Sequence, residues 1–339
     1  MHFAKERDYI GDIAQLFAVR EYTMRYGRAE GVRAIDVVTG SGLEVTILPD
    51  RAMDIYQVRF EGRGLNYLTK TGLVSPVHFD RSDSGWLRSF TGGFLTTCGM
   101  RNIGVPSHDA YEDSAQHGTL GNIPAGHVNI IRSLDDGVPC VEISGTMNDS
   151  QMFGYCLELT RTFRFRYGEN SFTFTDRVEN TGCRTSPLMM LYHFNMGYPL
   201  LCEDSKLIIP TRKIRPRTPH AADFADKYLE ITSPADDYEE MCYYHDLISA
   251  PDGGVSAGIA NPRLGIKMMI GFNKNELDHF VQWKMLGKGE YVTGLEPGNA
   301  TLDSRPDAAA NGSLKFIAPG ETKTYTLSVK VTKEQNDAV

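Results

Sequence analysis

Hydrophobic and polar residues alternate along most of the chain. In the segment L-E-V-T-I (43–47), three apolar side chains fall on one side and two polar ones on the other. A period of two is the pattern of a β-strand with one buried face. The Pro49-Asp50 dipeptide that follows predicts the end of this strand.

The clearest longer pattern predicts a hairpin over residues 157–178. Apolar residues share one face of 157–166, and the turn sequence G-E-N (168–170) leads into a second alternating run. Residues 314–331 repeat this arrangement around a Pro319-Gly320 turn. Alternating runs joined by short turns are typical of antiparallel strands.

Helical periodicity is weak. Residues 10–24 fit a short helix, residues 224–229 fit a single helical turn, and residues 212–237 are interpreted as a long ordered loop. The 33 glycines and 16 prolines suit many turns between short strands. We therefore predict an all-β fold, a large antiparallel β-sandwich formed as a single domain by residues 1–339.

The net negative charge bears on which molecules the protein can bind. Acidic residues number 43 against 35 basic ones, for a formal net charge of −8, which argues against general binding to nucleic acids or anionic membranes. The N-terminus has no apolar core like a signal peptide, and no run approaches the ~20 apolar residues of a membrane span. The six cysteines form no C-x-x-C pair, so we expect reduced thiols in a cytoplasmic protein.

Three widely separated residues are the main candidates for chemistry: His117, His193 and Glu296. Each lies beside glycine or at the end of an apolar, strand-like run. Two histidines and a carboxylate can supply a general acid, a general base and an orienting donor at neutral pH, if the fold brings them together. Each also has a structural interpretation: a buried histidine bonded to backbone for His193, a surface-loop histidine for His117, and a glutamate paired with arginine for Glu296.

Further residues could bind a polar substrate. Arg51 follows a predicted strand and could donate a fork of hydrogen bonds to a sugar hydroxyl or carboxylate. The alternative is an arginine–aspartate pair that fixes the turn. Trp283 stands beside a lysine, and the segment W-L-R ending at Arg88 holds the other tryptophan. Flat apolar rings with polar neighbours suit a sugar, although core packing explains them equally well.

Several signatures of cofactor and metal sites do not occur. The chain has no phosphate loop, no dinucleotide G-x-G-x-x-G, no G-x-S-x-G and no H-E-x-x-H. Glu112 and His117 have a weak metal-ligand spacing with no third ligand nearby. We expect neither a metal nor a cofactor.

Five segments resemble the aldose 1-epimerase-like proteins of the galactose mutarotase-type superfamily. They are L-P-D-R-A-M-D-I (48–55), F-T-G-G-F-L-T-T-C-G-M (90–100), H-G-T-L-G-N-I-P-A (117–125), L-Y-H-F-N-M-G-Y-P-L-L (191–201) and G-L-E-P-G-N (294–299). The resemblance implies a β-supersandwich with a concave sugar-binding face. It also implies that His193 protonates the ring oxygen, that Glu296 takes the anomeric hydroxyl proton, and that His117 holds the ring-oxygen side.

The chain departs from the galactose enzymes in its other substrate contacts. Their glycine-flanked arginine and later aspartate have no secure match, which leaves Arg51, Arg88 and Asp54 as candidates. We therefore predict a cofactor-free mutarotase or related epimerase for a monosaccharide. Pentoses, deoxypentoses, hexoses and acidic sugars remain open, as does the oligomeric state. The alternative is a carbohydrate-binding or sensing protein with the same cleft and no significant turnover.

Overall fold

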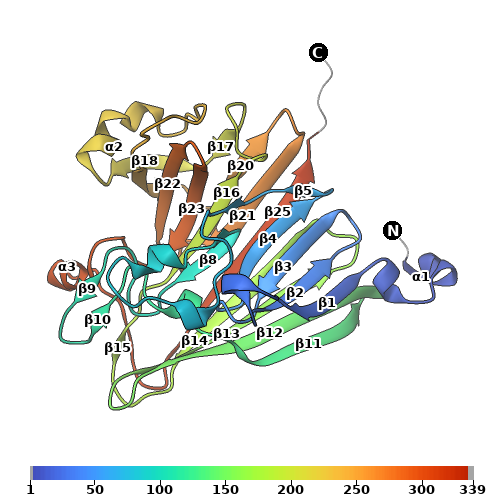
Figure 1. Ribbon diagram of the computed structural model, residues 1–339, viewed down its shortest axis with the longest axis horizontal. Helices are drawn as coiled ribbons and strands as arrows, with labels where there is room; N and C mark the ends of the chain where they lie inside the picture. The colour runs from blue at the N-terminus through green and yellow to red at the C-terminus, as the bar shows by residue number, and fades with distance from the viewer. Residues whose placement is uncertain (1–2, 335–339) are drawn as a thin grey trace.

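The computed structural model describes residues 3–334, most of which belong to three large antiparallel sheets (Figure 1). The longest sheet has the strand order β11-β12-β13-β14-β25-β21-β20-β17. In that order its strands span Gly126–Asp135, Val138–Ser150, Cys156–Arg166, Ser171–Asn180, Thr322–Lys333, Ile266–Asn273, Gly254–Asn261 and Lys206–Ile208.

The two other large sheets have six and five strands. The six-stranded sheet runs β18-β19-β22-β23-β16-β8, and the five-stranded sheet runs β1-β2-β3-β4-β5. The first comprises Thr211–Pro216, Met241–Leu247, His279–Gly287, Glu290–Gly298, Leu191–Gly197 and Leu95–Cys98. The second comprises Ala18–Thr23, Arg33–Val38, Leu43–Leu48, Asp54–Phe60 and Arg63–Gly64.

Short elements connect these sheets. Two-stranded pairs join β6 with β7, β9 with β10, and β15 with β24. Their bounds are Tyr67–Leu68, Gly92–Gly93, Ser107–His108, Asp113–Ser114, Ser186–Pro187 and Phe316–Ile317. The α-helices are α1 (Phe3–Glu6), α2 (Pro219–Asp223) and α3 (Arg305–Ala310). Within residues 3–334, none of the helices has the length and hydrophobicity needed to cross a bilayer.

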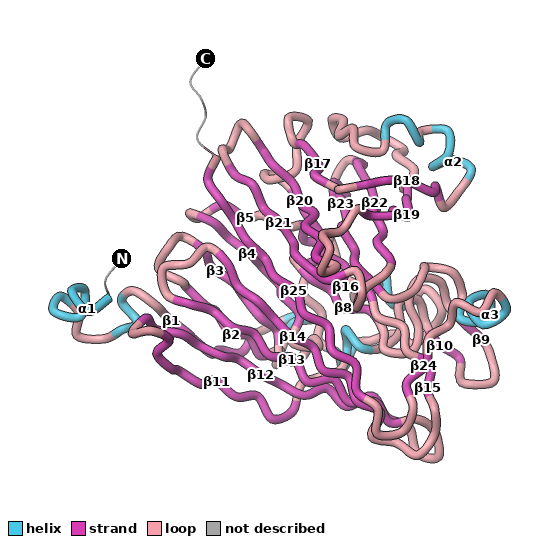
Figure 2. Tube along the Cα trace, turned by 180° about the vertical axis from the view of Figure 1, so that it is seen from behind, coloured by secondary structure: helices cyan, strands magenta, loops and turns pink. Residues whose placement is uncertain are grey.

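One hydrophobic core joins the three sheets. Val45 of β3, Phe163 of β13, Ile270 of β21 and Leu295 of β23 belong to the same buried cluster. The five-stranded sheet lies along the β11–β14 half of the long sheet, and the six-stranded sheet lies along the other half (Figures 1 and 2). The predicted all-β sandwich is therefore confirmed, with the long sheet as its shared layer.

The alternating patterns predicted their strands correctly. Residues 43–48 form β3, and the hairpin predicted over 157–178 is β13 paired with β14, with Phe163 opposite Phe174. In β25 the apolar residues predicted to share a face are all buried. The patterns worked because these strands have one core-facing side.

The helical and loop predictions need correction. Residues 10–24 contain only the 3₁₀ turn Ile13–Gln15, capped by Asp12, and then strand β1. Pairing with β2 overrides the weak helical spacing. Residues 212–237 are not one loop, because they include β18 and α2, which Thr218 caps. The single helical turn predicted near 224–229 is present at Ala225–Lys227.

Candidate active site

Two neighbouring strands bring His193 and Glu296 together. All residues of β16 are buried, and this strand lies between β23 and β8 within its sheet. His193 projects from β16 and Glu296 from β23, and His193 Nε2 lies 3.3 Å from Glu296 Oε1. Both side chains are almost fully buried, with 7% and 1% of their surfaces exposed. The histidine is thus neither a surface residue nor far from the glutamate.

His117 reaches the same place from a loop that precedes the 3₁₀ turn Leu120–Asn122. Its ring centroid lies 5.9 Å from that of His193. The backbone at His117 has a φ of 58°, and hydrogen bonds with Gly104 and Gly99 hold it there. The Gly104 amide also donates to Nδ1 of His117 at 3.4 Å. Because Nδ1 is an acceptor, the other ring nitrogen carries the proton and is a donor. The predicted convergence of the three residues is confirmed.

Aromatic rings surround the two histidines. Trp86 stacks on Phe90 with centroids 4.4 Å apart, and it lies 4.5 Å from the His117 ring. Trp283 meets the His193 ring edge to face at 5.4 Å. These rings give the site apolar faces beside its polar groups, an arrangement that suits the C–H faces of a sugar.

The rings and the three polar residues line a pocket with a volume of about 270 Å³. Arg217 and Glu240 also line it, and sequence reasoning missed both. The indole Nε1 of Trp283 donates to Glu240 Oε2 at 2.7 Å. Arg217 directly follows β18, within the segment 212–237 that was interpreted as a loop, and Glu240 directly precedes β19, outside that segment. No local sequence signal marks either residue as facing a pocket.

Burial controls the protonation of the site. It raises the pKa of Glu296 well above its usual range. The negative charge of nearby Glu240 raises this pKa further, whereas the positive charge of Arg217 lowers it. Burial lowers the pKa of His193 to about 4 and also lowers the pKa of His117. In the empty pocket both shifts therefore favour the uncharged forms, protonated Glu296 and neutral His193. An ion pair of carboxylate and imidazolium has the same total charge.

Polar atoms in the site have unused hydrogen-bonding capacity. Among residues 3–334, two atoms of pocket residues, His193 Nδ1 and Glu296 Oε1, are buried without a hydrogen-bond partner. Buried polar groups are nearly always paired in folded proteins, so such a cluster indicates a place for a polar ligand. No group of three His, Cys, Asp or Glu side chains suited to a metal ion occurs in this part of the chain.

Arg51 does not face the pocket, so its prediction as a substrate contact is wrong. Its guanidinium is buried and donates to the carbonyl oxygens of Val74 at 2.9 Å and Ser89 at 3.0 Å. Ser89 precedes Phe90, which lines the pocket. Arg51 therefore supports the pocket wall from behind.

The predictions for Asp54 and Arg88 are also wrong. Asp54 is buried outside the pocket, where it accepts hydrogen bonds from Thr97 and from Nη1 of Arg161 at 2.9 Å. The Arg88 side chain is 77% exposed and lies 3.6 Å from Asp80. Trp283, by contrast, does line the pocket. Sequence does not distinguish an arginine that points inward from one that points into solvent.

Arg305 fixes the loop that carries His117. It is fully buried at the start of α3, and its guanidinium donates to both Asp109 carboxylate oxygens at 2.6 and 2.8 Å. It also donates to the carbonyl oxygens of Arg101 at 2.8 Å and Glu112 at 3.0 Å. A bidentate arginine is a rigid anchor, so this residue ties the segment leading to His117 to the start of α3.

Gly294 gives the Glu296 carboxylate its space. A Cβ at this position would lie 2.3 Å from Glu296 Oε1 and 3.1 Å from the Cβ of Trp283. We predict that Gly294→Ala displaces this carboxylate and lowers the rate of the reaction proposed below roughly 10- to 10²-fold, because small displacements of reacting groups are costly. The control is Gly64→Ala, whose added methyl group meets no atom within 4 Å. Equal turnover in the two variants would show that the position of the carboxylate does not matter.

Comparisons with known proteins agree with this architecture. A Klebsiella pneumoniae protein described as a candidate aldose 1-epimerase superimposes with a TM-score of 0.89 at 22% identity, covering 97% of this chain and 86% of that one. A galactose mutarotase-like protein from Clostridium acetobutylicum superimposes with a TM-score of 0.67 at 15% identity, covering 94% of this chain and 99% of that one. The galactose 1-epimerase of Lactobacillus acidophilus superimposes with a TM-score of 0.58 at 13% identity, covering 94% of this chain and 100% of that one.

Sequence comparison adds a family but no characterised relative. The family model described as "Domain of unknown function (DUF4432)" matches residues 29–331. Curated protein sequences give no match. At these identities the structural likeness shows the fold alone, and it confirms the galactose mutarotase-like sandwich predicted from the sequence.

Proposed function

The chain belongs to the DUF4432 family, and we propose that it is a cofactor-free mutarotase, or closely related aldose 1-epimerase, acting on a free monosaccharide. One observation carries the proposal. Two buried titratable groups, His193 and Glu296, lie 3.3 Å apart in a pocket with aromatic walls, and each has an unpaired polar atom. A matched acid and base is what opening of a sugar ring requires.

The proposed reaction starts from the ion-paired form of the two groups. The Glu296 carboxylate removes the proton from the anomeric hydroxyl, O1, while the His193 imidazolium protonates the ring oxygen, O5. The C1–O5 bond breaks and C1 becomes an aldehyde. Rotation about C1–C2 presents the other face of the carbonyl, and reversal of the two proton transfers closes the ring as the other anomer.

The protonation of the pair suits this cycle. Ring opening converts the ion pair into protonated Glu296 and neutral His193, which is the form that burial favours in the empty pocket. The positive charge of Arg217 opposes the effect of burial on Glu296 and favours the carboxylate that the first step needs. The total charge of the site stays constant throughout, so the buried pocket never holds an uncompensated charge.

The remaining pocket residues would bind the sugar. His117 would donate a hydrogen bond on the ring-oxygen side, Arg217 would donate to hydroxyl oxygens, and the Trp283 ring would cover a C–H face. A volume of about 270 Å³ lies just below the ~300–1,000 Å³ typical of small-molecule pockets, which fits one sugar ring. The alternative, a sugar-binding protein without turnover, would need the rings and donors but no apposed acid and base.

The pH dependence follows from the shared proton. Below pH about 4, where His193 also becomes protonated, the pair loses its base and activity should fall. At higher pH the His193–Glu296 pair loses its one shared proton, and with it the acid. This loss occurs at a pH above the usual pKa range of glutamate, because burial raises the pKa of Glu296. We predict that kcat/KM, which reports on the free enzyme, rises through an inflection near pH 4 and shows no second inflection at the pKa of an ordinary histidine, after subtraction of the spontaneous rate. An inflection near ~6.5, the value of an ordinary histidine, would contradict this assignment.

The test of function is an anomer-exchange screen by NMR over pentoses, deoxypentoses, hexoses and uronic acids, with binding of each sugar measured by calorimetry. We expect at least one sugar to exchange faster with protein than in buffer. Binding of a sugar without faster exchange would favour the carbohydrate-binding alternative.

A further inference from the structure

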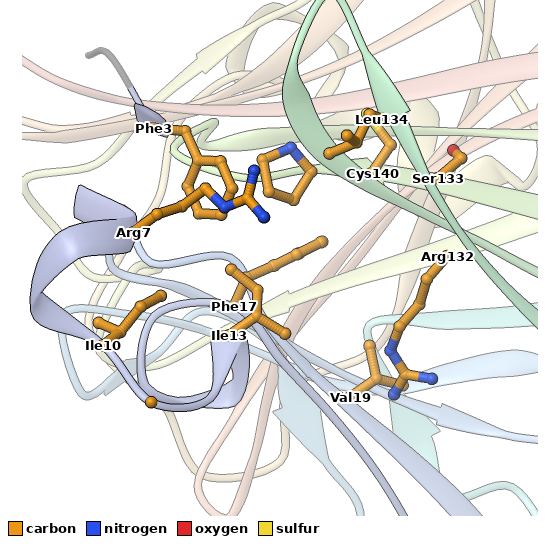
Figure 3. A pocket seen from close by; sticks show the side chains of 12 residues that line it. Phe3, Arg7, Ile10, Ile13, Phe17, Val19, Arg132, Ser133, Leu134 and Cys140 are labelled. Carbon is orange, nitrogen blue, oxygen red and sulfur yellow. The ribbon is translucent and has the colours of Figure 1, made fainter. Parts of the chain in front are cut away.

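A second cavity lies far along the fold from the proposed active site, between the N-terminal segment and the β11–β12 hairpin (Figure 3). Its volume of about 530 Å³ is larger than that of the pocket at His193, and the two share no lining residue. One wall comes from residues 3–19, which include the 3₁₀ turns Arg7–Tyr9 and Ile13–Gln15. The other comes from residues 132–140, where β11 leads into β12.

The walls of this cavity are mainly apolar. Phe3, Ile13 and Phe17 form its base, and Ile10, Val19 and Leu134 extend the apolar surface. The rings of Phe3 and Phe17 pack against the ring of Tyr167, at centroid distances of 5.6 and 6.2 Å. The Tyr167 hydroxyl in turn donates a hydrogen bond to the Glu6 carboxylate at 2.8 Å. The base is therefore continuous with the main core rather than a loose flap.

Two arginines line this cavity on opposite sides (Figure 3). Arg7 and Arg132 both line the cavity, and no acidic side chain lines it among the described residues. Neither guanidinium has a side-chain hydrogen bond or ion pair within residues 3–334, although the whole chain carries a net charge of −8. Two unpaired arginines over an apolar surface are complementary to an anion with an apolar body.

We propose that this cavity binds a small amphipathic carboxylate, with its acyl chain against Phe3 and Phe17 and its carboxylate paired with Arg7, whose guanidinium lies beside the Phe3 ring (Figure 3), while Arg132 adds positive charge on the far side of the cavity. The guanidinium group fits a carboxylate in planar, bidentate geometry. The apolar base supplies the favourable burial of the chain, at about fourfold in affinity for each added methylene. The site is independent of the proposed sugar chemistry.

The test is calorimetric titration of the full-length protein with octanoate, decanoate and decanol, below the micelle concentration of the two carboxylates and the solubility limit of decanol. Decanoate should bind, octanoate should bind roughly 16-fold more weakly because it has two fewer methylenes, and decanol should bind at least ~10-fold more weakly than decanoate because it cannot form an ion pair with arginine. Equal binding of decanol and decanoate would overturn the anion site. Absence of decanoate binding would overturn the proposal altogether.

A double variant assigns the binding to this cavity. Arg7→Gln with Arg132→Gln should weaken decanoate binding at least ~10-fold and leave sugar turnover and thermal stability unchanged, because both side chains are exposed. The matched control is Arg59→Gln with Arg63→Gln, two exposed arginines of β4 and β5. Equal loss of affinity in both double variants would mean that net charge, and not this cavity, attracts the anion.

Discussion

Replacing Glu296 with glutamine should lower the rate of anomer exchange by roughly 10²–10⁴, and His193→Asn should have an effect of the same size. Both substitutions keep the approximate shape of the side chain and its capacity for hydrogen bonds, while they remove useful proton transfer. The expectation follows from the 3.3 Å contact between the two groups, which makes them act on one substrate. Exchange rates measured by NMR at saturating sugar provide the comparison.

The double variant distinguishes a concerted pair from two independent groups. Residues that act as a unit give non-additive losses, so Glu296→Gln with His193→Asn should lose far less than the product of the two single effects. Sugar affinity should change only modestly, because the aromatic rings, His117 and Arg217 remain in the pocket. Near-normal exchange in Glu296→Gln would remove this glutamate as the base, and normal exchange in both single variants would favour the binding protein.

The largest effect on stability is expected for Arg161→Met. Arg161 is fully buried on β13 and donates to both Asp176 carboxylate oxygens at 2.7 and 2.6 Å. It also donates to Asp54 at 2.9 Å. Methionine would fill much of the space but leave two buried carboxylates without their cation. Removal of one partner from a buried ion pair costs about 3–5 kcal/mol, and we expect the free energy of unfolding to fall by this amount.

Arg164→Met is the matched control, because Arg164 lies on the same strand but is 49% exposed and pairs with Asp135 at 2.8 Å. Exposed pairs contribute about 0–1 kcal/mol, so denaturant unfolding should give a much smaller change. Similar losses in the two variants would show that the buried network is not the source of stability. The network also matters to the site, since Tyr192 donates to Asp176 at 2.9 Å and precedes His193 on β16.

The strands with one buried face could be predicted from sequence because their pattern has a period of two. The same pattern contained a signal that was missed. Arg161 and Asp176 stand at inward-facing positions of β13 and β14, and the register places them directly opposite one another. Complementary charges on the apolar faces of a predicted hairpin indicate a buried ion pair, whereas the contact of Asp54 with Arg161 depends on the tertiary structure.

The residues of the site were predictable to different degrees. His117, His193 and Glu296 lie in short segments that resemble a family, and the fold brings them together. Arg217 and Glu240 stand at the two ends of the segment between β18 and β19, which contains α2. The path of this segment depends on long-range packing rather than on a local sequence pattern. For the same reason, sequence alone could not separate these residues from arginines that support a wall or face solvent.

The most direct test of the proposed function is two-dimensional exchange NMR on a sugar that the panel identifies as a ligand, with wild-type protein and the Glu296→Gln, His193→Asn double variant at equal concentrations. Wild-type protein should produce exchange between the α and β anomers well above the spontaneous rate. The double variant should return exchange close to the level of buffer while it still binds the sugar by calorimetry. Exchange that persists at the wild-type rate in the double variant would contradict the assignment of these two residues as acid and base.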